Sequence, residues 1–482
     1  MKMLNFSNRF LTIISLFLLL SISNYTTAFT LDSTIIDSVE DNNIIISRQQ
    51  QWNHTYGGIL SDGWSHGQQT SDGGYVLAGY TYSYSKGKED IWLLKTDEQG
   101  QEIWNTSFGG VSHDEALSVI ETADLGYLIV GKTYSQNTQS TDAWIIKTDS
   151  KGTMIWNITY GGSDIDIGRY VQEIDNGDFI VSGITKTFDK TGCFLLRISN
   201  SGTILWNQTY MENFPYSLMN VFHIKQTNDQ GFLLAGQIHI QQGIDGFLLK
   251  TNETGEIIWF HTYGGSHTDF FKSFHIAKDE IILIGTTNSF DSKYFDVWLV
   301  KTDLNGSELW NVTFGGALND EGFSLDTCED NGYILTGYTY SKGNGYSDIW
   351  VIKTNHEGIY EWDEVYGSSS RDSGNFIMES DNRDIIVIGT YDGDGWMINI
   401  NQERIIQTKP IMMIGQIKEV ELKDNYSTFK ADGLLILEFT PIDIGVYTSG
   451  EMIYILKEEK AIRYDTFVFG IFQAGIDESI NN

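Results

Sequence analysis

The sequence predicts an all-β protein whose main body is a seven-bladed β-propeller made of four-stranded antiparallel blades. Seven tryptophans recur at gaps of 52, 52, 50, 53, 51 and 52 residues, namely Trp52, Trp104, Trp156, Trp206, Trp259, Trp310 and Trp362. A period near fifty is typical of arrays of one supersecondary unit. Each period holds four short strand-like segments separated by turns, which is the pattern of a propeller blade. Composition agrees, with 49 Gly, only 3 Pro and 13% aromatic residues.

Each repeat begins at its Trp with the pattern W-N-x-T-[YF]-G-G, as in Trp52–Gly58. The next segment leads through a turn to an apolar strand whose Gly recurs in all seven copies, from Gly79 to Gly389. A third strand with the pattern D-x-[WF]-x-x-K-[TI] follows, and the turn T-[DN]-x-x-G returns the chain to the next Trp. The Gly of that turn, first seen as Gly100, lies eight residues after the third-strand aromatic in all six copies. We therefore expect a rigid hairpin with positive φ at this Gly.

The first Trp segment, Gln51–Tyr56, has no blade before it, and the last blade has no Trp segment of its own. We predict that Gln51–Tyr56 becomes the outer strand of the seventh blade and closes the ring. The other strands of that blade are expected at Ser373–Ser380, Asp384–Thr390 and Gly395–Ile400. The alternative is an open solenoid, which leaves two sheet faces exposed and normally needs capping repeats.

Residues 1–28 are predicted to be a cleaved signal peptide. Lys2 and Arg9 precede the apolar run Leu11–Ile22, and Thr26, Thr27 and Ala28 supply small residues for cleavage. A single transmembrane anchor is the alternative, but the run is short for a span of about 20 residues. We expect a secreted or cell-surface protein with no membrane span in the mature chain.

The rest of the chain divides into three predicted parts. Residues 29–49 are expected to be a linker, 50–402 the propeller and 403–482 a small C-terminal β-rich domain. Strands of that last domain are expected at Ile411–Leu422, Leu434–Thr440, Met452–Leu456 and Phe467–Phe472. We assign this domain no function.

Charge and cysteine content restrict the partners. The net charge is −33, and removing residues 1–28 makes it −35 because that segment carries two basic and no acidic residues. Such a surface repels nucleic acid and anionic lipid and attracts cations or basic partners. Cys193 and Cys328 lie three repeats apart, so a disulfide framework is excluded and two free thiols are expected.

The combined pattern W-N-x-T-Y-G-G, D-G-G-Y, G-x-T and D-x-W-x-x-K-T-D resembles the β-propeller repeats of secreted bacterial and archaeal proteins over about residues 50–400. The resemblance implies the architecture but no single activity. The T-[DN]-x-x-G-x-x-x-W hairpin is similar to the Asp-box of sialidase-like propellers, where that turn is structural. Kelch repeats are similar in period and in their Gly pairs, although here the Gly pair ends the outer strand.

An Asp lies ten residues after six of the seven tryptophans, and the fourth copy has Tyr216 instead. The six are Asp62, Asp114, Asp166, Asp269, Asp320 and Asp372. A ring of carboxylates near the mouth of the channel could hold Ca²⁺, which takes six to eight oxygen ligands. The alternative is that each Asp caps its own loop by accepting backbone N–H groups. Strict repetition favours capping, and these residues are metal candidates only if they converge; no other cofactor is indicated.

After residue 28 the sequence contains eight N-x-[ST] triplets, at Asn53, Asn105, Asn157, Asn207, Asn252, Asn305, Asn311 and Asn425. Five of them follow a repeat Trp. A bulky solvated glycan on an outer strand would keep that sheet edge from pairing with another chain. The alternative is that these Asn are simply the solvent-facing polar residues of an alternating strand.

No catalytic residue can be named from the sequence. The nine His show no metal-ligand spacing, the mature chain has seven scattered Arg, and no nucleophile elbow or phosphate loop occurs. The repeated aromatic residues are interpreted as blade packing, with a carbohydrate platform as the alternative. The repeated third-strand Lys, such as Lys95, is expected to pair with a repeated Asp.

Two functions follow from this reading. The first is a non-catalytic extracellular binding or scaffold module. The alternative is a glycan-active hydrolase or lyase, which would need two carboxylates about 5–10 Å apart in a pocket unique to particular blades. A protein or glycan ligand is expected on the face that carries the crossovers between blades and the loops between second and third strands. These loops are Tyr80–Glu89, Thr133–Thr141, Thr286–Phe295 and Thr339–Ser347, and the irregular fourth crossover is Met211–Met219. The oligomeric state is left open.

Overall fold

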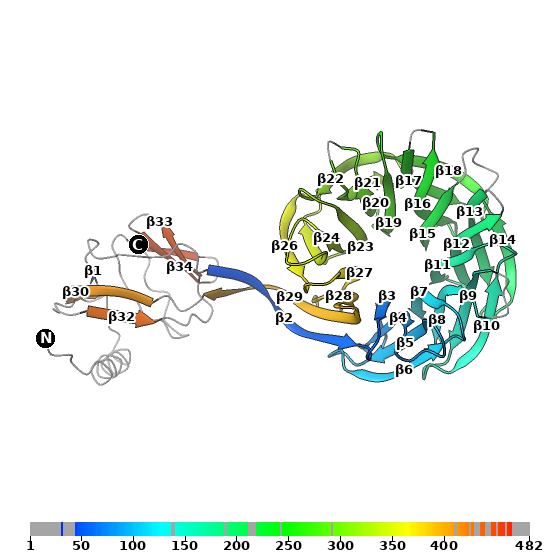
Figure 1. The fold of residues 1–482 in the computed structure, drawn as a ribbon. Coiled ribbons are helices and arrows are strands. Elements are labelled where there is room, and N and C mark those ends of the chain that lie inside the picture. Colours follow the sequence, from blue (N-terminus) through cyan, green and yellow to red (C-terminus); the bar gives the residue numbers. More distant parts are fainter. Residues whose placement is uncertain are drawn as a thin grey trace. The chain divides into compact units, whose positions relative to one another are not determined.

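The computed structural model shows a ring of seven four-stranded sheets, drawn in Figure 1 from blue at the first blade to orange at the last. Side chains are described for residues 52–401 except 136–139, 187–190, 211–217, 242 and 291–292. Outside that range the backbone is described only for the strands named below. The predicted all-β class and the seven-bladed propeller are confirmed.

The blades follow one another along the chain, each running from an inner strand at the channel to an outer strand at the rim. Blade 1 contains β3 (Asp62–Gln69), β4 (Tyr75–Thr81), β5 (Asp90–Thr96) and β6 (Glu102–Phe108); blade 2 contains β7 (Asp114–Glu121), β8 (Tyr127–Thr133), β9 (Asp142–Thr148) and β10 (Met154–Tyr160). Blade 3 contains β11 (Asp166–Glu173), β12 (Phe179–Thr187), β13 (Lys190–Ile198) and β14 (Ile204–Thr209); blade 4 contains β15 (Met219–Gln226), β16 (Phe232–Ile240), β17 (Gly243–Thr251) and β18 (Ile257–Tyr263). Blade 5 contains β19 (Asp269–Ile276), β20 (Glu280–Thr287), β21 (Asp296–Asp303) and β22 (Glu308–Phe314); blade 6 contains β23 (Asp320–Thr327), β24 (Tyr333–Thr339), β25 (Asp348–Thr354) and β26 (Tyr360–Tyr366).

Blade 7 is made from both ends of the propeller sequence. It contains β27 (Ser373–Glu379), β28 (Ile385–Tyr391) and β29 (Asp394–Thr408), and its outer strand is β2 (Ile44–Tyr56). In Figure 1 the blue β2 lies beside the orange β29. The prediction that Gln51–Tyr56 pairs with the strand containing Trp396 is therefore confirmed, although β2 begins seven residues earlier than expected. Closure leaves no open end in the ring, so the solenoid alternative is wrong.

Burial within a blade explains the sequence pattern of each strand. The middle strands β4 and β5 are packed by a neighbouring blade on each side, so almost all their residues are buried and their sequences are continuously apolar. No residue of the outer strand β6 is fully buried, and in the outer strand β10 exposed and half-buried residues alternate. In the second strand, a Cβ on Gly79 would lie 2.0 Å from the carbonyl oxygen of Gly63, so only glycine fits opposite the bulge in the inner strand.

The hairpin between the third and outer strands has the geometry that its spacing predicts. Its Gly has φ between 75° and 84° in all six copies, namely Gly100, Gly152, Gly202, Gly255, Gly306 and Gly358. The Asp or Asn at the start of the turn accepts backbone N–H groups; Asp97, for example, accepts from Gln99 and Gln101 at 3.0 and 2.8 Å. These turns are structural, as the resemblance to the Asp-box implies.

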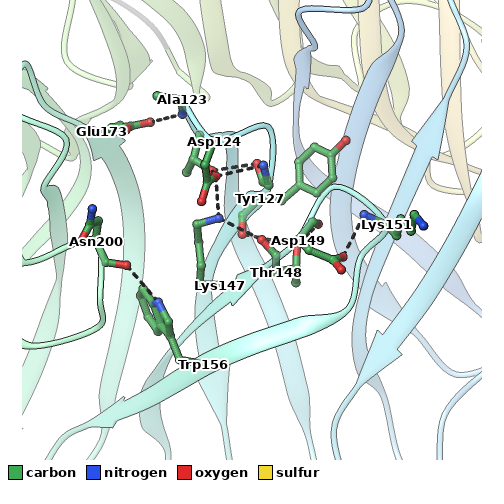
Figure 2. Close-up of polar contacts among 12 residues, drawn as sticks. Ala123, Asp124, Tyr127, Lys147, Thr148, Asp149, Lys151, Trp156, Glu173 and Asn200 are labelled. Atoms are coloured by element: carbon green, nitrogen blue, oxygen red, sulfur yellow. Dashed lines mark hydrogen bonds and ion pairs between the residues drawn. The ribbon is translucent and has the colours of Figure 1, made fainter.

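The repeated third-strand Lys lies at the same end of the blade, and Figure 2 shows one copy. Lys147 is almost fully buried, and its Nζ donates to Asp124 and to the Thr148 carbonyl, both at 2.9 Å. The same pairing occurs in five other blades, as Lys95–Asp72, Arg197–Asp178, Lys250–Asp229, Lys301–Glu280 and Lys353–Asp330. The expected pairing with an acidic residue is confirmed, with Glu in place of Asp in blade 5.

The chain divides into two compact units, one of residues 50–402 and one of residues 1–49 with 403–482. In the second unit, β1 (Thr30–Leu31), β31 (Tyr426–Thr428) and β32 (Leu434–Glu438) all pair with β30 (Met412–Lys423), and β33 (Gly445–Ser449), β34 (Met452–Lys457) and β35 (Lys460–Tyr464) form a second sheet. Parts of the predicted linker 29–49 are thus strand. The predicted signal peptide 1–28 and the predicted strand Phe467–Phe472 lie outside the described residues.

Candidate functional site

Five of the six repeated Asp residues begin the inner strands, and Asp372 directly precedes β27, at the face of the ring where the chain crosses from one blade to the next. Asp62 is opposite Thr81 in the second strand, and Thr81 is opposite Asp90 in the third. The second-to-third-strand loops leave the blades from this same edge. We call this side, made of the crossovers and those loops, the loop face; the T-[DN]-x-x-G hairpins lie on the opposite face.

Each of these Asp side chains is buried and accepts hydrogen bonds from its own blade. Asp62 Oδ2 accepts from Gly58 N at 2.9 Å, and its Oδ1 accepts from Thr81 Oγ1 at 2.5 Å. The bond from the crossover N–H recurs at Asp114, Asp166, Asp269, Asp320 and Asp372. The Asp residues therefore cap their own crossovers. Among the residues with described side chains, no group of three or more His, Cys, Asp or Glu is arranged to hold a metal ion.

A second carboxylate lies beside five of the capping Asp residues, and the sequence pattern does not single it out. This is the first Asp of the third strand in the preceding blade, as in Asp90 beside Asp114. Burial raises the pKa of Asp90, and the Asp114 carboxylate raises it further. The same causes raise the pKa of Asp142 beside Asp166. For Asp245, burial and the neighbouring Asp269 raise the pKa to about 6.

Aromatic side chains from the inner strands of four blades pack on one another. The His66 ring lies 4.3 Å from Phe376 and 5.3 Å from Tyr170, and Tyr170 lies 4.1 Å from His223. These contacts join blades 1, 3, 4 and 7. Burial lowers the pKa of His66 to about 4 and that of His223 further, so both rings are neutral at physiological pH.

Between this aromatic layer and the loop face, the channel holds two cationic side chains. Lys272 Nζ lies 4.1 Å from the centre of the Phe222 ring and 5.2 Å from that of Phe270, and Arg169 Cζ lies 5.4 Å from the Phe222 ring. Burial and the Arg169 charge lower the pKa of Lys272 to about 8, while Glu321 acts in the opposite direction. Arg169 Nε is buried and has no hydrogen-bond partner among the described residues.

The acidic residues near this cationic pair are held by other groups. Glu115 Oε2 lies 2.7 Å from Lys132 Nζ, and Glu321 takes a hydrogen bond from Tyr338. Arg169 and Lys272 therefore keep unused hydrogen-bonding capacity in a half-buried position. Sequence reasoning missed this pair because it treated the seven Arg as scattered. A signal did exist, since the residue three positions after each capping Asp, or after Met219 in the fourth blade, varies between blades: Ser65, Leu117, Arg169, Phe222, Lys272, Phe323 and Asn375.

Large exposed apolar side chains gather on the loop face. Ile59 is 98% exposed, Val111 80% and Tyr346 67%. The others on this face are Leu60, Tyr82, Tyr84, Tyr134, Ile165, Leu218, Phe290 and Leu318. They come from crossovers and second-to-third-strand loops of six blades. Other large apolar side chains, such as Leu125 and Ile359, are exposed on the opposite face.

The Asn residues of the glycosylation triplets lie on the rim or in hairpins. Asn53, Asn105, Asn157, Asn207, Asn305 and Asn311 are exposed and Asn252 is half-buried, while Asn425 lies outside the described residues. Asn157 Oδ1 accepts the indole N–H of Trp144 at 3.0 Å, and Asn105 and Asn311 do the same for Trp92 and Trp298. These Asn thus satisfy a buried Trp donor through Oδ1, while a glycan would attach at Nδ2.

Two surface hollows were found along blade seams at the rim. The larger has a volume of about 330 Å³ between blades 6 and 7 and is lined by residues that include Asn53, Tyr366 and Trp396. The second lies between blades 1 and 2, beside Trp144 and Asn157. Both use positions that recur in the repeat and neither is deep.

The described part of the chain contains no helix of the length and apolarity needed to cross a bilayer.

The fold defines a repeat β-propeller with exposed apolar side chains on its loop face and two cationic side chains, Arg169 and Lys272, in its channel. No family model matches the chain. A curated relative, the regulatory protein FlaEY of Caulobacter vibrioides, is 25% identical over 115 residues, which are 21% of this chain and 12% of that protein. The chain thus matches only about an eighth of the length of this relative.

Solved structures were found that are similar to this chain at low sequence identity. Sqt1 from Chaetomium thermophilum is 8% identical with a TM-score of 0.47, and the similarity covers 74% of this chain and 100% of that one. The dihydro-haem d1 dehydrogenase NirN is 10% identical with a TM-score of 0.42, covering 83% and 76%. The α-L-arabinofuranosidase Arb93A from Fusarium graminearum is 9% identical with a TM-score of 0.38, covering 59% and 91%. Their different activities do not indicate what this chain does.

Proposed function

We propose that the protein is a non-catalytic extracellular binding module that captures its ligand on the loop face. The observation that carries this proposal is the set of large apolar side chains exposed there, of which Ile59, Val111 and Tyr346 are the most exposed. Variable loops on a rigid scaffold are also where propellers and similar folds place recognition.

The ligand is proposed to carry a negatively charged group that enters the channel mouth. Arg169 and Lys272 are cationic side chains of the channel, and their half-buried position strengthens their attraction for a carboxylate, sulfate or phosphate. An extended acidic polymer is disfavoured by the net charge of −33. A glycan or protein segment with a single acidic group fits both features.

The glycan-active enzyme receives less support from this geometry. Its general acid and base would have to be a carboxylate pair specific to particular blades. The close pairs, such as Asp90 with Asp114 and Asp142 with Asp166, recur around the ring. The channel carboxylates Glu115 and Glu321 are already held by Lys132 and Tyr338.

A screen of the purified protein against glycan and extracellular-protein arrays, followed by titration of each hit, tests this proposal. Replacing Ile59, Val111 and Tyr346 together by Ser should weaken the hit at least about tenfold, because each loses apolar contact area. The matched control replaces Leu125, Leu304 and Ile359 by Ser, since these are exposed apolar residues on the opposite face. Equal losses in both triple variants, or turnover of a glycan hit, would contradict the proposal.

A further inference from the structure

Side chains from the inner strands of blades 3 to 6 meet in the channel and form a mixed cationic and aromatic cluster. Lys272 Nζ lies 4.1 Å from the centre of the Phe222 ring and 5.2 Å from that of Phe270. The same Nζ lies 5.7 Å from the centre of the Phe323 ring, and Arg169 Cζ lies 5.4 Å from that of Phe222. We call these five residues the channel cluster. Its two cations have one phenyl ring as a common neighbour.

Solvent reaches the channel cluster from the loop face. All five of its residues are half-buried. Asn220 and Glu321, which are nearer the loop face on the same strands, are also half-buried. His223 follows Phe222 towards the opposite face and is only 5% exposed. A small group that enters from the loop face therefore meets the channel cluster before it meets the buried His223.

The charges around the channel cluster do not balance. Glu115 is close enough to Arg169, and Glu321 to Lys272, for each pair to interact electrostatically. Glu115 also binds Lys132 at 2.7 Å, so three cations face two carboxylates and one positive charge is left over. Arg169 Nε is buried and has no hydrogen-bond partner among the residues with described side chains. A buried donor without a partner is costly, which indicates that an acceptor binds there.

We propose that the channel cluster binds a carboxylate attached to an apolar body, either the C-terminal residue of a polypeptide or a free aromatic acid. Arg169 and Lys272 hold the carboxylate through charge-assisted hydrogen bonds, and the phenyl rings cover the apolar body. This inference rests on the proposed function, since it specifies the group that the ligand of the loop face inserts into the channel.

The lining of the cluster favours this class of ligand over other anions. Inorganic phosphate or sulfate would bring a second negative charge close to Glu115 and Glu321, in a chain whose net charge is −33. The three phenyl rings have no hydrogen-bonding atoms, so they offer nothing to the hydroxyl groups of a sugar. An apolar body, in contrast, is stabilised by leaving water for such a surface.

Titration calorimetry of the full chain at pH 7 with phenylacetate as the probe tests this inference. We expect one phenylacetate per chain. Phenylacetamide, which has the same shape without the charge, and acetate, which lacks the ring, should each bind at least about tenfold more weakly. The tripeptide glycyl-glycyl-phenylalanine and its C-terminal amide distinguish the two sources. Tighter binding of the free tripeptide than of phenylacetate indicates a polypeptide C-terminus, and the opposite order indicates a free acid.

Variants of the two cations locate the site. Lys272→Met and Arg169→Met should each weaken phenylacetate binding at least about tenfold, whereas Lys272→Arg keeps the charge and should retain most of the affinity. Lys225→Met is the matched control, because Lys225 is a half-buried channel residue three positions after Phe222 and outside the channel cluster. This control should bind phenylacetate like the unaltered chain. Thermal melting of each variant shows that it is folded.

Several results would overturn the inference. They are equal affinity for phenylacetate and phenylacetamide, tighter binding of inorganic phosphate than of phenylacetate, and the same loss of affinity in Lys225→Met as in Lys272→Met. The triple Ser variant of Ile59, Val111 and Tyr346 should still bind phenylacetate, because it leaves the channel cluster intact. An array hit that persists in a chain that does not bind phenylacetate would refute this inference alone, and phenylacetate binding without any array hit would count only against the proposed function.

Discussion

Closure of the ring by β2 leads to a quantitative prediction. Deleting residues 50–57 should destabilise the propeller far more than deleting the eight residues 36–43. The deletion removes Tyr56, which is 7% exposed and whose hydroxyl donates to the Gly100 carbonyl at 2.6 Å, and Trp52, which packs on Tyr75 at 6.1 Å. It also exposes the edge of β29.

The magnitude follows from these contacts. Loss of a buried aromatic side chain costs about 3–5 kcal/mol, the half-buried Trp52 adds about 2 kcal/mol, and the Tyr56 hydrogen bond adds about 1 kcal/mol. The sum of about 6–8 kcal/mol is comparable to the whole stability of many domains. At about 2 °C per kcal/mol for a domain of this size, the melting temperature should fall by more than about 10 °C.

Thermal melting followed by far-ultraviolet circular dichroism and by calorimetry provides the assay. Tyr210→Phe and Tyr263→Phe calibrate the hydrogen bond, because both hydroxyls donate to a hairpin Gly carbonyl at 2.6 Å just as Tyr56 does. If the 50–57 deletion melts within about 2 °C of both the full chain and the 36–43 deletion, β2 does not stabilise the ring and the reasoning is wrong.

Further predictions concern charge, stability and modification. Lys272→Met should weaken ligand binding yet stabilise the chain by about 1–2 kcal/mol below pH 8, because the pKa of Lys272 is lowered in the folded chain. This gain in stability should disappear as the pH rises from about 8 towards the ordinary pKa of Lys. A stability gain that does not change with pH in denaturation experiments would refute this. In EDTA, Asp245→Asn should stabilise the chain by about 1–2 kcal/mol above pH 6 and should not change its stability near pH 4. The reason is that a raised pKa of an Asp makes the native chain less stable as the pH rises. An equal gain in stability at both pH values, measured by urea unfolding, would contradict this prediction. Asp124→Ala should lower the free energy of unfolding by about 2 kcal/mol, because it leaves the buried Lys147 ammonium with only the Thr148 carbonyl as a partner. Lys147→Met should lower it by less than about 1 kcal/mol. A larger loss of stability for Lys147→Met than for Asp124→Ala in urea unfolding would contradict this prediction. In a host that N-glycosylates secreted proteins, intact mass should exceed that of the chain cleaved after residue 28, and Asn53→Gln should remove one glycan; a mass equal to the bare polypeptide rules glycans out.

Particular residues show how far the sequence could lead towards the site. The capping Asp residues can be predicted because they recur at a fixed distance from the Trp, and the sequence leaves open whether they cap loops or bind a metal. Their partners, such as Asp90, also recur, but the sequence pattern identifies them only as the first residue of a strand. The contact between Asp90 and Asp114 depends on how two successive blades are set against each other, and no local pattern reports that.

The sequence by itself determined the number of blades, the place of each strand and the closure by Gln51–Tyr56. These features are local or follow from counting, because the strand period, the hairpin Gly100 and the bulge opposite Gly79 are each encoded within one repeat. Only the tertiary structure decided which side chains meet across the channel and the seams. Arg169 and Lys272 approach the same Phe222 because closing seven blades into a ring brings three inner strands to one axis, a consequence of ring geometry that no single repeat contains.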